Sequence, residues 1–266
     1  MLKLRGLGVV GILAGLAALG AQPAHAQTVS VAPITMTGGP VPPPPINLTT
    51  LGPDGWIKWG STNPNSGNYL STTGQTFTTT ASGIGTTPAF DNSPGGNNNV
   101  SFTWTNGNLG NNSQTLGLLY ENPGAGGNSL GTQFTVSVPT VGPTGKVQFY
   151  VADLGDATSL TAQLKDGSGT VLNSQTDNSL DAPVDPINGQ TFDTGYFAVN
   201  YSGAASGDTL LLTYTATQDH GAGTVIGPGY IGIQAAALQG SVPEPATIAT
   251  LGIALLGCAL RRRRTN

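Results

Sequence analysis

The chain has 266 residues, of which 40 are glycine, 19 are proline and only 8% are charged. Residues 27–260 carry 3 lysines against 13 acidic residues, a formal charge of −10, so neither nucleic acid nor an anionic membrane surface is an expected partner. The only cysteine, Cys258, lies in a C-terminal apolar segment, and His220 is the only histidine after residue 26. Disulfides and Cys/His zinc sites are therefore excluded.

The N-terminus has the pattern of a secretory signal peptide. Lys3 and Arg5 precede an apolar run over residues 7–21, and Ala24 and Ala26 have the small side chains that a signal peptidase accepts. We expect cleavage after Ala26 and export through the inner membrane. The alternative is a retained N-terminal anchor, for which the apolar run is short.

Residues 27–46 are polar and rich in proline, with four consecutive prolines at residues 42–45. Consecutive prolines favour an extended polyproline II rod without internal hydrogen bonds. The segment is predicted to be a spacer. The alternative is that its first residues add an edge strand to the domain that follows.

Residues 47–240 are predicted to form one all-β domain, because apolar residues recur at every second position, as in Phe134–Val138 and Leu210–Ala216. Turns such as Asp166–Gly169 separate short strands, which favours an antiparallel two-sheet β-sandwich, jelly-roll-like first and immunoglobulin-like second. No helix is expected, and 90–113 and 122–131 are predicted as long surface loops. Further strands are expected at 46–51, 56–59, 100–105, 114–120, 146–153, 160–165, 170–175, 195–201 and 230–238.

The C-terminus combines three elements in a fixed order. Pro243, Glu244 and Pro245 precede an apolar segment over residues 247–260, and the chain then carries an arginine cluster, Arg261, Arg262, Arg263 and Arg264. This order resembles the PEP-CTERM sorting signal of Gram-negative bacteria. The resemblance implies that an exosortase recognises the Pro-Glu-Pro element and processes the chain there.

The physical chemistry of this tail agrees with sorting. Four arginines resist translocation and stay in the cytoplasm, which leaves the domain outside. The apolar segment is expected to form a short transmembrane helix that anchors the chain in the inner membrane transiently, with a retained anchor as the alternative. The expected organisation is signal peptide 1–26, spacer 27–46, sandwich 47–240 and sorting tail 242–266, with a final location at the cell surface or outside the cell.

No combination of residues predicts a catalytic centre. Gly127–Gly131 matches G-x-S-x-G, but a strand-like segment follows Ser129 and His220 would be the only base. Glycoside hydrolysis needs two carboxylates across the sugar bond, and no spacing selects a partner for Glu121. We expect neither an enzyme nor a cofactor, and the alternative is an exported polysaccharide-active hydrolase that uses Glu121.

Two patterns suggest weaker binding sites. Asp177, Asp181 and Asp185 lie at intervals of four in a predicted loop, and oxygen ligands of this kind suit calcium, although such aspartates more often cap turns. Trp56, Trp59 and Trp104 are candidates for stacking on sugar rings. Because Trp56 and Trp59 are an odd interval apart on one strand, they are expected on opposite faces, one in the core and the other nearer the surface.

The leading hypothesis is an exported, noncatalytic β-sandwich protein of the extracellular matrix or biofilm that contacts exopolysaccharide. Its processing partners are signal peptidase and an exosortase. A purely structural or adhesive matrix protein is an alternative. Strands with alternating threonines also leave open a flat ice-binding surface.

Overall fold

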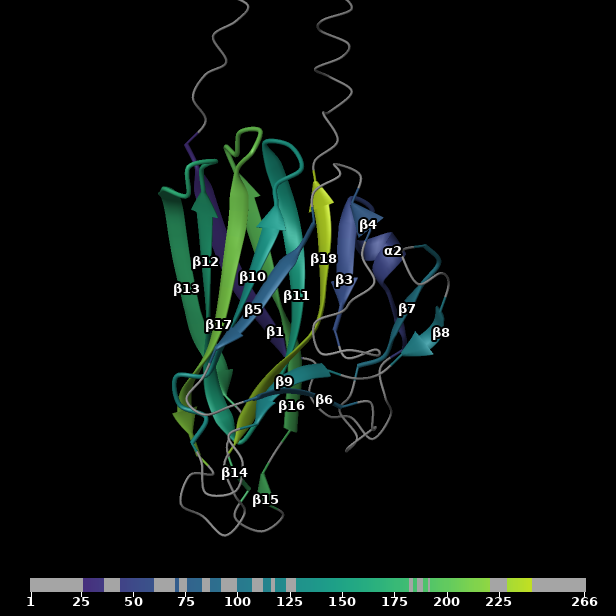
Figure 1. The fold of residues 1–266 in the computed structure, drawn as a ribbon, viewed down its shortest axis with the longest axis vertical. Coiled ribbons are helices and arrows are strands. Elements are labelled where there is room, and N and C mark those ends of the chain that lie inside the picture. Colours follow the sequence, from purple (N-terminus) through teal and green to yellow (C-terminus); the bar gives the residue numbers. More distant parts are fainter. Residues whose placement is uncertain are drawn as a thin grey trace, which may run out of the picture.

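The computed structural model describes residues 26–35, 44–59, 70–71, 76–82, 87–91, 100–106, 112–115, 118–122, 128–181, 184–185, 189–190, 192–220 and 229–240. These residues are mostly in antiparallel strands, so the predicted all-β class is confirmed (Figure 1). Within these ranges no helix has the length and apolar character needed to cross a bilayer.

Two sheets make up most of the structure. The large sheet has the order β1-β16-β11-β18-β3-β4, with β9 paired to β18 and β6 paired to β9. Its strands are β1 (Thr28–Thr35), β3 (Gly55–Lys58), β4 (Leu70–Ser71), β6 (Thr87–Asp91), β9 (Leu118–Asn122), β11 (Thr144–Leu154), β16 (Phe192–Ser202) and β18 (Tyr230–Gly240). The five-stranded sheet has the order β13-β12-β17-β10-β5. Its strands are β5 (Thr78–Ser82), β10 (Gln133–Pro139), β12 (Asp156–Lys165), β13 (Val171–Asp181) and β17 (Thr209–Asp219).

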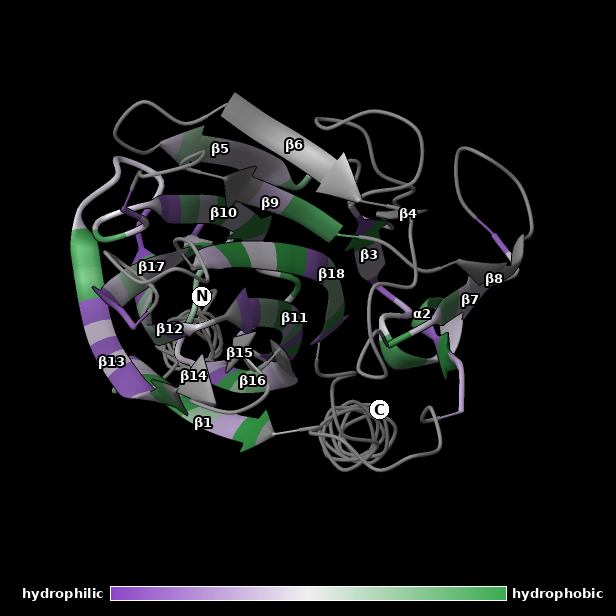
Figure 2. Cartoon of the chain, turned by 90° about the horizontal axis from the view of Figure 1, so that it is seen from below, coloured by the Kyte–Doolittle hydropathy of each residue, from purple (hydrophilic) through white to green (hydrophobic). Residues whose placement is uncertain are grey.

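The two sheets face each other across one core, as the view from below shows (Figure 2). From β9 onward the chain alternates between the two sheets. Strand β10 lies in the five-stranded sheet, β11 in the large sheet and β12 in the five-stranded sheet again. β13 stays beside β12, and β16, β17 and β18 then alternate in the same way. Strands β9-β18-β11-β16 of one sheet therefore lie opposite β10-β17-β12-β13 of the other.

The core between the sheets is built from the alternating apolar residues that the sequence pattern identified. Phe149 and Phe197 from the large sheet pack edge-on against Tyr214 of β17, with ring centroids 6.3 and 6.1 Å apart. All three side chains are fully buried. Such aromatic pairs add about 0.5–1.5 kcal/mol each beyond the area they bury.

A small outer layer packs on the far face of the large sheet. It consists of β2 (Ile46–Asn47), the helix α2 (Leu48–Leu51), β7 (Phe102–Trp104) and β8 (Asn112–Thr115). Leu48, Phe102 and Trp104 form a second buried cluster with Trp56 and Tyr150 of the large sheet. Strand β7 confirms the strand expected at 100–105, and the prediction of a surface loop over 90–113 is wrong for these residues.

The helix α2 replaces part of the strand predicted at 46–51 and contradicts the expectation of no helix. The Asn47 side chain accepts a hydrogen bond from Thr50 N at 3.2 Å, which satisfies one of the free amide groups at the start of the helix. One turn of helix is too short to produce a readable apolar period.

The start of the predicted spacer is strand β1. It pairs with β16 along its whole length, from Thr28↔Ser202 to Thr35↔Gly195. The edge-strand alternative is thus correct for residues 28–35, and 36–43 lie outside the described residues. Across the edge between the sheets, Asn173 of β13 bonds Val29 N at 3.2 Å and Gln27 O at 3.1 Å.

The predicted hairpin turn after β12 is present. The Asp166 carboxylate accepts hydrogen bonds from Ser168 Oγ at 2.7 Å, Thr170 N at 2.8 Å and Ser168 N at 2.9 Å. These bonds, the one from the Ser168 side chain above all, hold the pKa of Asp166 below the usual range. Gly169 has a φ of +89°, a conformation that glycine adopts without strain. A last short pair of strands, β14 (Val184–Asp185) and β15 (Gly189–Gln190), lies between β13 and β16 in the chain.

Candidate functional site

The outer face of the large sheet, which points away from the five-stranded sheet, is only partly covered by the outer layer. Within the described residues, the part of this face beyond the outer layer includes the exposed side chains of Ser30 on β1, Asn200 on β16 and Gln239 on β18. On these strands Lys146, Asn200 and Gln239 alternate with the core residues Val147, Val199 and Leu238, so their side chains lie on the outer face. We call Lys146, Asn200 and Gln239 the polar row.

The polar row is aligned by strand pairing. Lys146 is the direct partner of Asn200 on β16 and of Gln239 on β18. Asn200 is in turn opposite Ser30 of β1, and its amide nitrogen bonds Ser30 Oγ at 3.4 Å. Lys146 is partly exposed on this face, whereas Asn200 and Gln239 are exposed.

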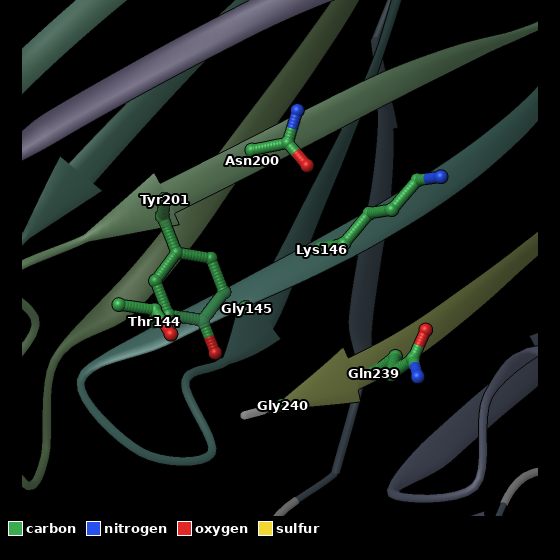
Figure 3. A pocket seen from close by; sticks show the side chains of 7 residues that line it. All are labelled: Thr144, Gly145, Lys146, Asn200, Tyr201, Gln239 and Gly240. Carbon is green, nitrogen blue, oxygen red and sulfur yellow. The ribbon is translucent and has the colours of Figure 1, made fainter. Parts of the chain in front are cut away.

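A hollow of 320 Å³ lies at the end of this row (Figure 3). It is lined by Thr144, Gly145, Lys146, Asn200, Tyr201, Gln239 and Gly240. A Cβ atom at residue 145 would collide with the Tyr201 ring, so glycine is needed there. Val141 N donates to Tyr201 Oη at 3.0 Å, and burial raises the pKa of Tyr201, which keeps the phenol neutral.

Two tyrosines and a glutamine continue the face beyond the polar row. Tyr150 and Tyr196 are direct partners on β11 and β16, with ring centroids 5.1 Å apart. Tyr150 is buried under the outer layer, whereas Tyr196 is partly exposed. Tyr150 Oη donates to Gln148 Oε1 at 2.7 Å, and burial raises the pKa of this tyrosine, so it stays a donor.

These side chains have the chemistry of a surface for neutral or weakly charged sugars. Asn200, Gln239 and Gln148 offer amide donors and acceptors, and Lys146 is a strong donor. A partly exposed tyrosine ring supplies an apolar surface with a polar tip. Neighbouring strands are about 4.8 Å apart, so the groups form a regular array.

The three tryptophans of the sequence hypothesis are not on the surface. Trp56 has 0%, Trp59 1% and Trp104 2% of its area exposed. Trp56 and Trp59 do face opposite sides, as predicted, because Trp56 belongs to the second cluster and Trp59 to the main core. The expectation that one lies nearer the surface is wrong, because the outer layer covers Trp56, whose ring centroid is 5.4 Å from that of Trp104.

Lys58 is buried on the same outer side of β3 as Trp56. Its Nζ donates to Trp59 O and lies 5.3 Å from the centre of the Phe102 ring. Burial lowers the pKa of Lys58 to about 7. Nothing in the sequence pattern distinguished this lysine from an exposed one.

The G-x-S-x-G serine is also buried. Ser129 Oγ donates to Asp156 Oδ1 at 2.7 Å, and Ser129 N donates to Asp219 Oδ2 at 2.9 Å. Strand β10 follows at Gln133, so the turn into a helix that makes a nucleophile elbow is missing here. Ser129 is a structural donor to two carboxylates in this arrangement.

Asp156 and Asp219 are direct partners on β12 and β17. Burial raises the pKa of Asp156 to about 7; the Ser129 hydrogen bond opposes this shift and the charge of Asp219 adds to it. Asp156 Oδ2 is buried without a hydrogen-bond partner. The cluster is thus held together most easily when Asp156 carries a proton.

The predicted calcium ligands are on strands rather than in one loop. Asp177 and Asp181 belong to β13 and Asp185 to β14. Residues four apart in a strand are separated by about 13 Å, too far to ligate one ion together. Asp177 Oδ1 accepts bonds from Ser179 N and Oγ at 3.0 and 2.7 Å. Over the described ranges no three His, Cys, Asp or Glu side chains are grouped to hold a metal, and calcium binding stays a prediction.

Several predicted residues lie outside the described ranges. These are Ala24 of the signal cleavage site and the tail residues Pro243, Glu244, Pro245, Arg261, Arg262, Arg263 and Arg264. The backbone of Glu121 pairs with Ile231, but its side chain is not described. The residues that sequence reasoning missed are those of the polar row and Tyr196, since only strand pairing aligns them.

The described residues define an all-β chain with exposed polar side chains on the outer face of its large sheet. Its C-terminal residues 241–264 match the PEP-CTERM protein-sorting motif, which confirms the resemblance seen in the sequence and implies an exported substrate of an exosortase.

No curated protein matches the chain. Among solved structures, the enzymatically active domain of bacteriophage CBA120 tailspike protein 4 matches at 15% identity and a TM-score of 0.34. That match covers 62% of this chain but only 19% of the tailspike chain, and a likeness of this size does not define an activity.

Proposed function

We propose that this protein is a noncatalytic component of the cell surface or extracellular matrix that contacts exopolysaccharide through the outer face of its large sheet. The observation that carries the proposal is the alignment of Asn200, Lys146 and Gln239 across three strands, beside the partly exposed ring of Tyr196.

The body is best described as a jelly-roll-like sandwich. The order β9-β18-β11-β16 opposite β10-β17-β12-β13, with the chain alternating between sheets, supports this assignment. In such a sandwich the strands are buried on one face only, so the outer faces are free to carry recognition residues.

The polar row suits an extended sugar polymer. A sugar ring presents hydroxyl groups around its edge, which accept from Lys146 and exchange hydrogen bonds with the amides of Asn200 and Gln239. The Tyr150 ring packs beside the Tyr196 ring. This contact restricts the Tyr196 ring before a ligand binds, so less entropy is lost on binding. Residues on rigid strands keep their spacing before the polymer arrives.

The position of the row relates the body to its sorting tail. Thr28, Ser202 and Thr144 are aligned at one end of the large sheet, and Gly145 is opposite Gly240. The matched sorting motif begins at residue 241, directly after this end. In the proposed route, signal peptidase removes the leader, the tail anchors the chain transiently in the inner membrane as a short helix, and exosortase processing leaves the protein at the surface.

Co-sedimentation of the mature protein with the exopolysaccharide of its own cells tests the contact. We expect the wild type to sediment with the polymer and Tyr196→Ala and Asn200→Ala to lose most of this retention, because the ring and one amide of the face are removed. Leu130→Ala is the matched control, since Leu130 is 50% exposed elsewhere on the molecule. Equal retention of all four proteins, or none for the wild type, would overturn the proposal.

A further inference from the structure

The outer face of the five-stranded sheet carries a row of threonines that the polysaccharide proposal does not use. Thr80 on β5 is opposite Thr135 on β10, which is opposite Thr213 on β17. Thr213 is opposite Thr161 on β12, which is opposite Thr176 on β13. The threonine row therefore crosses every strand of the sheet.

The rows on either side have similar chemistry. On β10, β17 and β12, one flanking row is Gln133, Thr215 and Ser159, and the other is Ser137, Leu211 and Gln163. None of these nine positions is charged or aromatic, although the chain between residues 27 and 260 has a formal charge of −10. These nine positions thus form a neutral surface of hydroxyls, methyls and two glutamine amides on an acidic molecule.

The array is regular because the strand pairing is continuous here. β10 and β17 pair without a register shift, and the shift between β12 and β17 lies at Ala157/Thr158, outside the three rows. Hydroxyls repeat about every 4.8 Å across the strands of the threonine row, and outward-facing side chains repeat about every 6.7 Å along each strand.

The side chains of this array are held in place. Thr side chains are stiff at χ1, and Thr161 Oγ1 and Thr176 Oγ1 are 2.8 Å apart in a mutual hydrogen bond. Beneath the row, Val136, Leu212 and Ala162 are fully buried in the core and fix the strands. Ordering the array therefore costs little when a partner binds.

We propose that this threonine face binds the surface of ice. Ice presents oxygen atoms in a fixed two-dimensional repeat, and a rigid plane of hydroxyls can replace some of them. The methyl groups restrict the water molecules between the hydroxyls, which favours an ordered layer. The lack of aromatic rings on the three central rows disfavours a sugar polymer, which would use ring stacking.

Incorporation of the mature, full-length protein into a slowly growing ice surface tests this proposal, with ice recrystallisation as a second readout. We expect the wild type to enter the ice and to inhibit recrystallisation. Thr213→Lys, at the centre of the face, should abolish both effects, because a long charged side chain lifts the plane off the ice. Ile34→Lys, at an exposed position on β1 of the large sheet, is the control and should behave as the wild type.

Circular dichroism of each variant separates misfolding from loss of binding. Thr213→Val keeps the shape of the side chain and removes only its hydroxyl group, so it tests the contribution of that hydroxyl. Exclusion of the folded wild type from ice would overturn the proposal, as would equal loss in the Ile34→Lys control. Retention on insoluble neutral polysaccharide that is lost in Thr213→Lys, without any effect on ice, would also overturn it and assign the face to a glycan.

Discussion

At the scale of single residues, Asp156 is a carboxyl group that is buried and also lies directly opposite a second carboxyl group, that of Asp219. It has one hydrogen bond, from Ser129, one buried oxygen without a partner, and Asp219 directly across the strand pair. Like charges on opposite strands are destabilising, so a proton on Asp156 relieves both the burial cost and the repulsion.

The raised pKa of Asp156 leads us to expect that the stability of the protein depends on pH. The folded pKa of about 7 lies above the ordinary value of 3.8, so between these values the native state keeps a proton that the unfolded chain has released. The free energy of unfolding should therefore fall as the pH rises through this window. Asp156→Asn should remove that loss and stabilise the protein at pH 8 by on the order of 2 kcal/mol.

Urea unfolding at pH 5 and pH 8 measures this effect. Asp166→Asn is the control, because the pKa of Asp166 is lowered rather than raised. If the wild type and Asp156→Asn lose stability equally between the two pH values, Asp156 does not carry the dependence.

At the scale of elements, the outer layer decides which part of the large sheet is free. Trp104 of β7 packs on Trp56 of β3, and Asn106 Oδ1 accepts bonds from Trp56 Nε1 at 3.1 Å and Thr49 Oγ1 at 2.9 Å. Strand β3, which carries Trp56, is thereby buried on its outer face as well as on its core face. Among the described residues, the polar row lies on the part of the sheet beyond this layer, on β16, β11 and the end of β18.

Removal of the Trp104 ring should show how strongly this layer is attached. Trp104→Ala leaves a cavity against Trp56 and is expected to destabilise the protein by about 3–5 kcal/mol. Chemical denaturation compares it with Leu130→Ala, an exposed position for which a change within about 0.5 kcal/mol is expected. A loss no larger than that of the control would mean that the layer is not part of the cooperative fold.

At the scale of the whole molecule, the first and last strands of the body, β1 and β18, reach the same end of the large sheet. Thr28 pairs with Ser202, Ser202 pairs with Thr144, and the neighbouring Gly145 pairs with Gly240. The sorting motif follows at residues 241–264. The hollow beside Lys146 is therefore close to the point where the tail leaves, and the Ser129–Asp156 cluster lies toward the other end of the strands.

The tail predicts a defined mass for the mature protein. Surface protein should lack Arg261–Arg264, because processing at Pro243–Pro245 removes everything after it. Glu244→Ala should keep the tail and remain with the inner membrane, whereas Thr247→Ala, just beyond the motif, serves as the control. Mass spectrometry of the surface fraction decides, and an intact arginine cluster on wild-type surface protein would contradict processing.

The sequence by itself determined the features that depend on local order along the chain. The period of two predicted β10, β11, β16, β17 and β18, Asp166–Gly169 predicted a turn, and the order of motif, apolar segment and arginines identified the sorting signal. Each rests on residues near one another in sequence. Only the tertiary structure decided that Trp56 is buried, that Lys146 is aligned with Asn200 and Gln239, and that the threonines form one row. Strand pairing and layer packing bring together residues that are far apart in the chain, and no local pattern encodes their register.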